Sequence, residues 1–314
     1  MDQVIGIDLG GTFIKAGLVD RSGQLLSQHK VATRGREFDQ VCDQIAEVVR
    51  EISGPDQLLP ACIAVPGGIC PDKETISQAP NFPRWNHVKL VSALRNRGLS
   101  QVQIENDANL AALGESWLGR GRDFEHMVLF TLGTGVGGGV ILNRQIWNGT
   151  FGMAGELGHI PIYPEGLLCG CGGSGCLEQY ASATALIRAA KAAQSRGLCP
   201  LLRSSSGDAD FDVRDMADAA RAGDADCQAL FAAAGQALGI AIAGLLNAMN
   251  FPFFAIGGGV SPAFDLLQGA IWREVKGRAF RQPAQGVIIQ AAELGNQAGF
   301  LGAARLAFLN KVTG

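Results

Sequence analysis

Short apolar segments separated by turns open the chain, a pattern typical of strands. Residues 4–7 are apolar and lead into Asp8, and a second such segment, 13–19, follows after a few residues. The turn at 21–23 then leads to a third segment at 25–31. Connections this short join antiparallel neighbours, so we expect hairpin-linked strands at the start of a sheet.

A helical period replaces this pattern between residues 38 and 52. Apolar residues recur there at three- and four-residue spacing, which places them on one face of a helix, and Gly54-Pro55 is a stop signal. The unbroken apolar run 61–65 predicts a buried strand. Residues 71–87 look irregular, and a helix is expected at 88–96.

The second half of the chain repeats the first in layout, with a strand, a glycine loop and a returning strand. The glycines 133–139 separate a predicted strand from its hairpin partner. Two α/β halves are therefore expected, each opening on such a loop. Further strands are predicted at 102–105, 127–132, 139–142 and 253–256, and further helices at 107–118, 179–196, 213–222, 225–249 and 296–309.

Composition and charge exclude several classes of protein. Hydrophobic residues make up 47% and charged residues 18%, as in ordinary globular proteins. A net charge of -3 with interleaved signs argues against nucleic acid or an anionic membrane as partner. The N-terminus lacks the cationic region of a signal peptide, and the most apolar stretch, Ala237–Leu246, is too short to span a bilayer. A cytoplasmic protein is expected.

Two glycine loops are candidates for phosphate binding. In Gly10-Gly11-Thr12 and Gly133-Thr134-Gly135, glycine lets backbone N–H groups approach phosphate oxygens, and threonine adds a hydroxyl donor. Asp8, at the end of the first strand, could hold hydrated Mg²⁺. The alternative is two hairpins that need glycine only for positive φ.

The second loop also matches a dinucleotide fingerprint, but its context excludes that function. Residues 133–138 fit G-x-G-x-x-G, yet a strand rather than a helix follows them. No Gly-Lys-Ser or Gly-Lys-Thr occurs in the sequence, so a Walker loop is absent. Any phosphate binding here is of the hairpin type.

Asp107 lies between a predicted strand and a predicted helix. At this position its carboxylate could cap the helix. It could equally face a cleft and accept a proton from a hydroxyl group. The position in the sequence leaves both interpretations open.

A cysteine cluster at 169–176 predicts a metal site. Cys169, Cys171 and Cys176 lie among glycines, and His159 is the nearest of the four histidines. Three thiolates and an imidazole make a closed tetrahedral zinc site, with free thiols as the alternative. A closed site leaves no position for water, so this zinc would be structural. The other cysteines are expected to be buried and reduced: Cys42, Cys62, Cys70, Cys199 and Cys227.

Taken together, these motifs resemble the ROK family, sugar kinases of the actin-like ATPase superfamily. Residues 8–12 are similar to its first phosphate motif, 105–109 to its catalytic segment and 133–139 to its second phosphate loop. Residues 156–159 and 169–178 are similar to its sugar and zinc signatures. The resemblance extends from residue 4 to the last helix.

The resemblance implies a two-lobed, ribonuclease H-like α/β fold with the active-site cleft between the lobes. The small lobe would comprise residues 1–117 and 296–314, and the large lobe residues 118–295 would carry the zinc. The implied reaction is ATP- and Mg²⁺-dependent phosphorylation of a hexose, normally at O6, in a homodimer.

The resemblance also implies roles for individual residues. Asp107 would be the general base. The sugar would contact Gly67, Asn81, Asn106, Asp107, Glu156, His159 and Glu178. ATP and Mg²⁺ would be held by Asp8, Gly10, Gly11, Thr12, Gly133, Thr134, Gly135 and Gly258. The structural zinc would be held by His159, Cys169, Cys171 and Cys176.

The expected sugar is glucose, because residues 81–85 and 112–115 look most like glucokinases of the family. N-acetylglucosamine, N-acetylmannosamine and fructose kinases share nearly every motif and remain alternatives. The family's repressors carry a DNA-binding module before the first strand, where this sequence has only Met1-Asp2-Gln3, so none is expected. A sugar sensor without catalysis would be expected to lose Asp107 or a phosphate loop.

The zinc is expected to shape the sugar pocket, since Glu156 and Glu178 closely flank its ligands in the sequence. Losing it should weaken sugar binding more than ATP binding, because the phosphate loops are expected to lie elsewhere.

Overall fold

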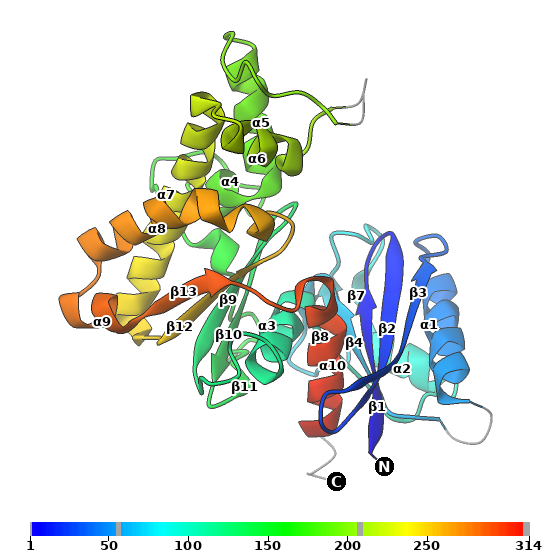
Figure 1. Ribbon diagram of the computed structural model, residues 1–314. Coiled ribbons are helices and arrows are strands. Elements are labelled where there is room, and N and C mark those ends of the chain that lie inside the picture. The colour runs from blue at the N-terminus through cyan, green and yellow to red at the C-terminus, as the bar shows by residue number, and fades with distance from the viewer. Residues whose placement is uncertain (1, 55–57, 206–209, 310–314) are drawn as a thin grey trace. The chain divides into compact units, whose positions relative to one another are not determined.

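The computed structural model describes residues 2–54, 58–205 and 210–309, which form two compact units (Figure 1). Unit 1 comprises residues 1–125, 139–155 and 293–314, and unit 2 comprises 126–138 and 156–292. The five C-terminal residues that the sequence assigns to the small lobe, 310–314, lie outside the described residues.

Unit 1 is built from a mixed sheet flanked by helices. Its sheet elements are β1 (Gln3–Leu9), β2 (Phe13–Asp20), β3 (Leu25–Ala32), β4 (Ala61–Val65), β5 (Gly68–Ile69), β6 (Ile76–Gln78), β7 (Asn86–Val88), β8 (Val102–Asn106) and β11 (Gln145–Ile146). Its helices are α1 (Phe38–Ser53), α2 (Leu90–Arg95), α3 (Asp107–Trp117), the 3₁₀ turn η3 (Gly295–Gln297) and α10 (Ala298–Leu309).

The main sheet of unit 1 has the order β3-β2-β1-β4-β8. β1, β2 and β3 are antiparallel neighbours, as the short connections predict, whereas β4 runs parallel to both β1 and β8. Asp8 is paired with Ala64, and Val65 is paired with Asn106. The carboxyl ends of β1, β4 and β8 therefore meet at one edge, where the candidate residues of this unit are gathered.

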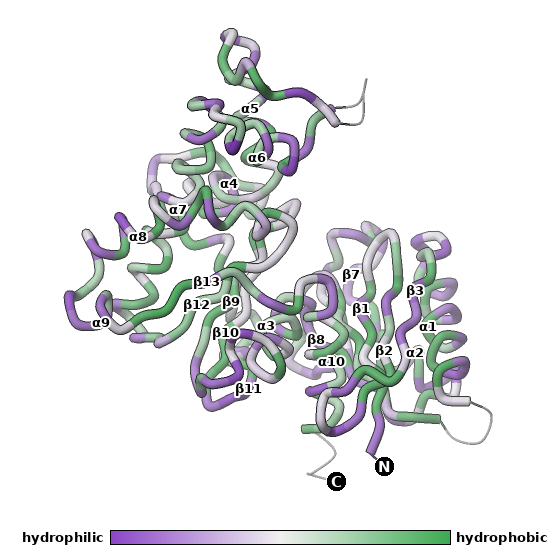
Figure 2. Tube along the Cα trace, viewed as in Figure 1, coloured by the Kyte–Doolittle hydropathy of each residue, from purple (hydrophilic) through white to green (hydrophobic). Residues whose placement is uncertain are grey.

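The core of unit 1 lies on both faces of this sheet. On one face, apolar residues of β1, β4 and β8 pack with the buried stripes of α1 and α2. On the other face, α10 packs against β1, β4 and α3. In Figure 2 the colour of α10 is mostly hydrophobic, whereas hydrophobic and hydrophilic colours alternate along α1 on the other face of the sheet. Gly6 permits the close approach of α10, since a Cβ there would lie 1.8 Å from the Phe300 carbonyl oxygen.

A small antiparallel sheet, β5-β6-β7, has β6 and most of β7 within residues 71–87, where irregular structure is expected from the sequence. Its strands have only two or three residues, too few for an alternating pattern to be visible in the sequence. Phe82 stacks on Trp85 with ring centroids 4.4 Å apart, and both are buried. The expected helix at 88–96 is shorter, because β7 includes Val88.

Unit 2 combines strands with a layer of long helices. Its strands are β9 (Met127–Leu132), β12 (Phe253–Gly257), β13 (Ile288–Ala291) and the first residues of β10 (Val136–Leu142), which divides between the units. Its helices and 3₁₀ turns are η1 (Leu157–His159), α4 (Glu178–Ala181), α5 (Ala183–Gln194), α6 (Val213–Arg221), α7 (Ala225–Met249), η2 (Ser261–Ala263), α8 (Phe264–Arg278) and α9 (Arg281–Gly286). β12 runs parallel to β9 and β13, within the sheet order β10-β9-β12-β13.

Helix α7 corrects the expectation that the most apolar stretch of the chain is too short to span a bilayer. The stretch Ala237–Leu246 belongs to a 25-residue helix, which by length and composition alone could cross a membrane. More than half of its apolar window is buried inside the protein, and α7 packs against α4, α5, α6 and α8.

Other expectations in unit 2 also change. The predicted helix 179–196 is two helices, α4 and α5. They are separate because Ser182 caps the start of α5, where its hydroxyl accepts a hydrogen bond from the Ala185 N–H. No element was predicted between residues 260 and 295, where the structure has α8, α9 and β13. Buried residues of α8 recur at helical spacing, Leu267, Ala270, Ile271 and Val275, so this helix was detectable.

The unit boundaries differ from the sequence-based lobes at short segments: 118–125, 139–155 and 293–295 belong to unit 1. Two contacts explain the difference. α3 packs against β11, and the buried Glu115 carboxylate accepts hydrogen bonds from the N–H groups of Glu293 and Leu294.

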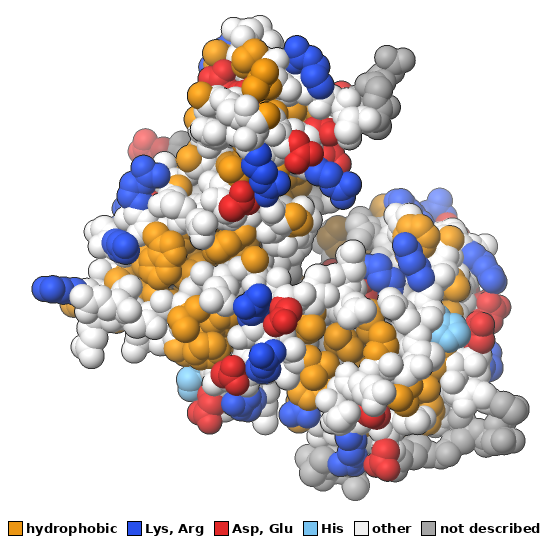
Figure 3. Space-filling view, in the orientation of Figure 1, with side chains coloured by type: hydrophobic (Ala, Val, Ile, Leu, Met, Phe, Trp, Pro, Cys, Tyr) orange, Lys and Arg blue, Asp and Glu red, His pale blue; other side chains and the backbone are white. Residues whose placement is uncertain are grey.

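The surface shown in Figure 3 carries lysine and arginine side chains interspersed with aspartate and glutamate. This mixture agrees with the small net charge of -3.

Candidate active site

The first glycine loop joins β1 to β2. Thr33, the residue after β3, binds this loop through two hydrogen bonds. Its N–H donates to the Thr12 carbonyl (2.9 Å), and its hydroxyl donates to the Gly10 carbonyl (2.8 Å). Neither Gly10 nor Gly11 has a positive φ, so the interpretation that these glycines serve only a strained hairpin is wrong. Close packing restricts these positions instead: a Cβ on Gly10 would lie 2.9 Å from the Phe13 carbonyl oxygen, and a Cβ on Gly11 would lie 3.2 Å from the Asn81 Cβ.

Asp8 and Lys15 form an ion pair beside this loop. They are register partners in β1 and β2, and Lys15 Nζ lies 3.3 Å from Asp8 Oδ2. Burial raises the pKa of the Asp8 carboxyl above its ordinary value, and Lys15 opposes this shift. A carboxylate oxygen is a ligand that Mg²⁺ accepts, so the donor at Asp8 fits the predicted cation.

The junction of β8 and α3 tests the capping interpretation of Asp107. Asn106, not Asp107, caps the helix: its Oδ1 accepts hydrogen bonds from the N–H groups of Ala108 (2.9 Å) and Asn109 (3.1 Å). Asp107 is the first residue of α3, and its Oδ1 also accepts from the Ala108 N–H (2.8 Å). The capping alternative is therefore wrong for Asp107.

Asn106 also ties this junction to Gly67. Its Nδ2 donates to the Gly67 carbonyl (3.0 Å), so one N–H of the amide is left for a ligand. Gly67 has φ +125°, and a Cβ there would lie 2.0 Å from the Gln78 carbonyl oxygen. The backbone of the hairpin thus requires glycine at this position.

The second glycine loop joins β9 to β10 and is held by the start of α5. The Gly133 carbonyl accepts from the Ala183 N–H (2.8 Å), and the Thr134 carbonyl accepts from the Thr184 hydroxyl (2.7 Å). Gly133 has no positive φ, and a Cβ there would meet no atom within 4 Å. Packing within the protein therefore does not require glycine at position 133. A ligand that approached the backbone closely would require it.

Glu178 contacts this loop directly. Its Oε2 accepts a hydrogen bond from the Val136 N–H (3.0 Å), and a Cβ on Gly135 would lie 2.3 Å from the same oxygen. Gly158 packs on the same stretch, since its Cβ would lie 2.0 Å from the Val136 carbonyl oxygen. The expectation that the phosphate loops lie apart from the zinc and sugar segments is therefore wrong for the second loop.

The cysteine loop gathers the predicted zinc ligands into one group. The ligand atoms of His159, Cys169, Cys171 and Cys176 all lie within 4.8 Å of one another. The sulfur atoms of Cys171 and Cys176 are 3.7 Å apart, and Zn–S bonds of about 2.3 Å at a tetrahedral angle place sulfurs about 3.8 Å apart. The donor set and its spacing fit a zinc ion.

The two ring nitrogens of His159 have different neighbours, and two of the thiols have pKa values shifted in opposite directions. His159 directs Nδ1 toward Cys169 Sγ (3.7 Å), and its Nε2 lies 4.0 Å from Glu156 Oε2. Burial raises the pKa of Cys176 to about 12, whereas hydrogen bonding to the Gly173 backbone lowers the pKa of the exposed Cys171. The Nδ1 atom of the imidazole thus points to the cysteines, and its Nε2 atom points to Glu156.

Gly258 follows β12 with φ +83°, where a Cβ would lie 2.4 Å from the Leu132 carbonyl oxygen. Its identity is explained by packing against the end of β9. A role for it in nucleotide binding stays a prediction.

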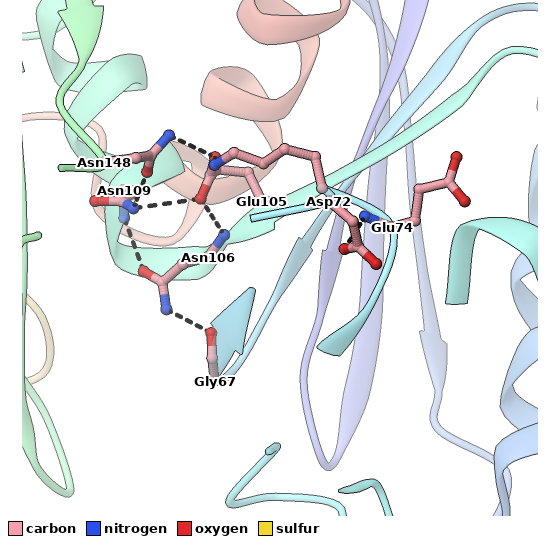
Figure 4. A network of polar contacts seen from close by, with 8 residues as sticks. Gly67, Asp72, Glu74, Glu105, Asn106, Asn109 and Asn148 are labelled. Atoms are coloured by element: carbon pink, nitrogen blue, oxygen red, sulfur yellow. Dashed lines mark hydrogen bonds and ion pairs between the residues drawn. The ribbon is translucent and has the colours of Figure 1, made fainter. Parts of the chain in front are cut away.

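A polar network that no sequence pattern indicated lies behind residues 105–109 (Figure 4). Its centre is Glu105, which is only 3% exposed and receives hydrogen bonds from side chains of Lys73, Asn109 and Asn148. Glu105 was quoted in the motif but given no role of its own. Lys73 and Asn148 are distant in the sequence, so no local pattern connects them with it.

In the two segments that suggested glucose, Trp85 and Glu115 serve the fold. Trp85 is buried against Phe82 and Phe38, and its indole N–H donates to the Arg36 carbonyl (3.2 Å). Glu115 is fully buried and accepts backbone hydrogen bonds. Neither side chain is available for a sugar, whereas Asn81 in the first segment is exposed.

Comparison with known proteins identifies the family. The sequence model of the ROK family matches residues 4–309. A glucokinase from Thermotoga maritima is 36% identical, over 97% of this chain and 96% of its own. A xylose repressor from Caldicellulosiruptor bescii is 28% identical, over 96% of this chain but 76% of its own.

A crystal structure agrees with this relationship. The ROK family glucokinase from Streptomyces griseus, in complex with glucose and AMPPNP, superposes with a TM-score of 0.83 at 36% identity, over 98% of this chain and 99% of that one. The chain belongs to the ROK family and has its two-lobed α/β fold of the actin-like ATPase class. The resemblance seen in the sequence and the expected fold class are confirmed.

Proposed function

We propose that the protein is an ATP-dependent glucokinase that transfers the γ-phosphoryl group of ATP to O6 of glucose. The observation that carries the proposal is the β8–α3 junction, where Asn106 takes over the cap and Asp107 begins the helix. The choice of glucose is supported by the glucokinase relatives, which match along nearly their whole length.

In the proposed reaction Asp107 accepts the proton of the sugar hydroxyl as its oxygen attacks the γ-phosphorus and ADP leaves. Phosphoryl transfer needs positioning and charge stabilisation more than covalent help from the protein. Backbone N–H groups of the two glycine loops would bind the phosphates. Asp8 would hold hydrated Mg²⁺, which neutralises phosphate charge.

Sugar hydroxyls would be held by the exposed Asn81, the remaining amide N–H of Asn106, and the side chains of Glu156, His159 and Glu178. Glu156 and His159 are already neighbours through Nε2. The backbone of Gly67 would complete the lining at the hairpin.

Structural zinc is part of the proposal. His159, Cys169, Cys171 and Cys176 would hold it, and as a closed site it would supply rigidity rather than chemistry. This rigidity would reach Glu178, because the Gln179 N–H donates to the Cys176 carbonyl (3.0 Å) at the start of α4.

We further propose a cytoplasmic homodimer with a hexose and ATP as its small-molecule partners and without a nucleic-acid or membrane partner. Light scattering should give about twice the chain mass of 32.9 kDa. A monomer over the whole concentration range would overturn the dimer.

A hexose panel with ATP tests the function. ADP release is measured with glucose, mannose, fructose, N-acetylglucosamine and N-acetylmannosamine, and glucose should give the highest kcat/KM. A higher value for an N-acetylhexosamine or for fructose would replace the proposed substrate. The absence of turnover with every sugar would favour a non-catalytic regulator, since a xylose repressor is among the relatives.

A further inference from the structure

Glu105 is a buried carboxylate with an unusually complete set of hydrogen-bond donors. Oε1 accepts from the Asn106 backbone N–H (3.0 Å) and from Asn109 Nδ2 (3.3 Å). Oε2 accepts from Lys73 Nζ (2.8 Å) and from Asn148 Nδ2 (3.1 Å). A charge removed from water in this way needs both a counter-ion and hydrogen bonds, and this network supplies both.

The partners of Glu105 come from separate segments of unit 1. Lys73 lies in the turn between β5 and β6, Asn109 in the first turn of α3, and Asn148 just after β11. The same β5–β6 hairpin is also tied to Asn106 through the Gly67 carbonyl. The hairpin is therefore fastened to the β8–α3 junction at its base and at its tip.

The negative charge of Glu105 sets the orientation of the Asn109 amide. Asn109 Nδ2 donates to both Glu105 and Asn148, while its buried Oδ1 has no hydrogen-bond partner among the described residues. Turning the amide over would place that oxygen against a carboxylate. A charged Glu105 thus keeps the first turn of α3 in one arrangement, directly beside Asp107.

We propose that the Glu105–Lys73 ion pair positions the catalytic dipeptide Asn106-Asp107, so that its loss lowers kcat while ATP binding is kept. Glu105 and Lys73 are positioning residues: they act through Asn106 and Asn109 and not on the substrate. The inference rests on the proposed function, because it takes Asp107 as the base. Misplacing a reacting group by about 1 Å commonly costs on the order of 100-fold in rate.

A cavity gives access to this ion pair. It has a volume of about 440 Å³, and its lining includes Lys73, Glu105 and Asn148 as well as Arg95 and the apolar Val102 and Ile104. The Lys73 side chain itself is 43% exposed. A small alkylammonium ion can therefore be offered from solution in place of a missing lysine.

The experiment compares variants of Lys73 and Glu105 by steady-state kinetics. Lys73→Met should lower kcat about 10- to 100-fold with the KM for ATP within about twofold of wild type. Lys73→Arg, which keeps the cation, should retain most of kcat. Lys73→Ala should lose kcat and regain it on addition of propylammonium, a response that a general loss of stability would not give.

Glu105→Gln keeps an acceptor for the Asn106 N–H but turns an amide N–H group toward Lys73 and Asn148. It should lower kcat to a similar extent, and combining it with Lys73→Met should add little, because both changes break one interaction.

Arg97→Met is the matched control. The half-buried Arg97 pairs with Asp39 (2.9 Å) and Asp43 (2.6 Å) in the same unit, so its loss tests the removal of a paired cation away from the junction. Its kcat should stay at the wild-type value. Wild-type kcat in Lys73→Met, equal losses in Lys73→Met and Arg97→Met, or no rescue by propylammonium would overturn the positioning role. None of these results would touch the proposed function, which wild-type turnover of glucose tests separately.

Discussion

In the proposed reaction Asn106 would cap the helix and Asp107 would act as the base, so that the two tasks fall to separate residues. The amide of Asn106 satisfies the first N–H groups of α3 and holds the Gly67 carbonyl. The carboxylate beside it is then placed at the start of a helix by its neighbour's cap. This division suits a base that must exchange a proton during every turnover.

Asp107→Asn should lower kcat by at least about 100-fold, the usual scale of lost general-base catalysis. Glucose binding should survive, because an amide still hydrogen-bonds a hydroxyl group. The measurements are steady-state kinetics and glucose titration by calorimetry. Asp212→Asn is the control, since Asp212 caps α6 in unit 2 and asparagine is an equally good cap. Near-normal kcat in Asp107→Asn would exclude the assignment.

Glu115 illustrates how a motif residue can serve the fold alone. It is fully buried, and its carboxylate accepts backbone N–H groups from Arg120 (3.2 Å), Glu293 (2.9 Å) and Leu294 (2.7 Å). It thereby joins the end of α3 to the segment before α10.

Glu115→Gln should destabilise the protein by about 1–3 kcal/mol, because a backbone donor loses its acceptor inside the protein. Urea unfolding measures the change in midpoint. The ratio of kcat/KM between glucose and mannose should stay as in wild type. A changed ratio with unchanged stability would instead place Glu115 in sugar selection.

At the scale of elements, the cysteine loop, the turn at Glu156 and the second phosphate loop form one connected region of unit 2. Glu178 bonds the Val136 N–H, and Gly158 packs on the Val136 carbonyl. Zinc bound at the cysteine loop would therefore restrain the phosphate loop as well as the sugar-binding side chains.

Cys171→Ser should lose bound zinc and lower kcat/KM roughly 10- to 100-fold, the scale at which ordering around a metal commonly matters. Because of the Glu178–Val136 contact, the KM values for glucose and ATP should both rise. Metal analysis of the purified proteins comes first, with about one zinc per wild-type chain. Cys70→Ser, in unit 1, is the control. Full activity in zinc-free protein would show that the metal is not needed.

Elements with strong periodicity were predictable from the sequence. The stripe of α1 and the apolar runs of β4, β9 and β12 gave elements of the right type at nearly the right bounds. The strands β6 and β7 were not predictable, because three residues show no alternation. The break at Ser182 depends on a single capping hydroxyl inside an otherwise continuous helical pattern.

The site was predictable where its residues are close in the sequence. The predicted zinc ligands lie within one loop and its neighbouring turn, and the structure brings these four residues together. The network around Glu105 was not predictable, since Lys73 and Asn148 reach it only through the folding of unit 1. The same holds for the contact of Glu178 with the second phosphate loop.

At the scale of the whole molecule, the chain carries the residues to which the family resemblance assigns the chemistry. Both glycine loops, Asp107, Glu156 and Glu178 are present, and 97% of the chain aligns with a glucokinase. The repressor relatives carry additional length that this chain does not match. Catalysis is therefore the property that most needs to be measured.

The most direct measurement is identification of the product formed from ATP and glucose labelled with ¹³C at C6. The wild-type protein should produce a C6 resonance split by coupling to phosphorus, in step with ADP release, and Asp107→Asn should produce almost none. Phosphate on another carbon, or ADP released without a phosphorylated sugar, would contradict the account.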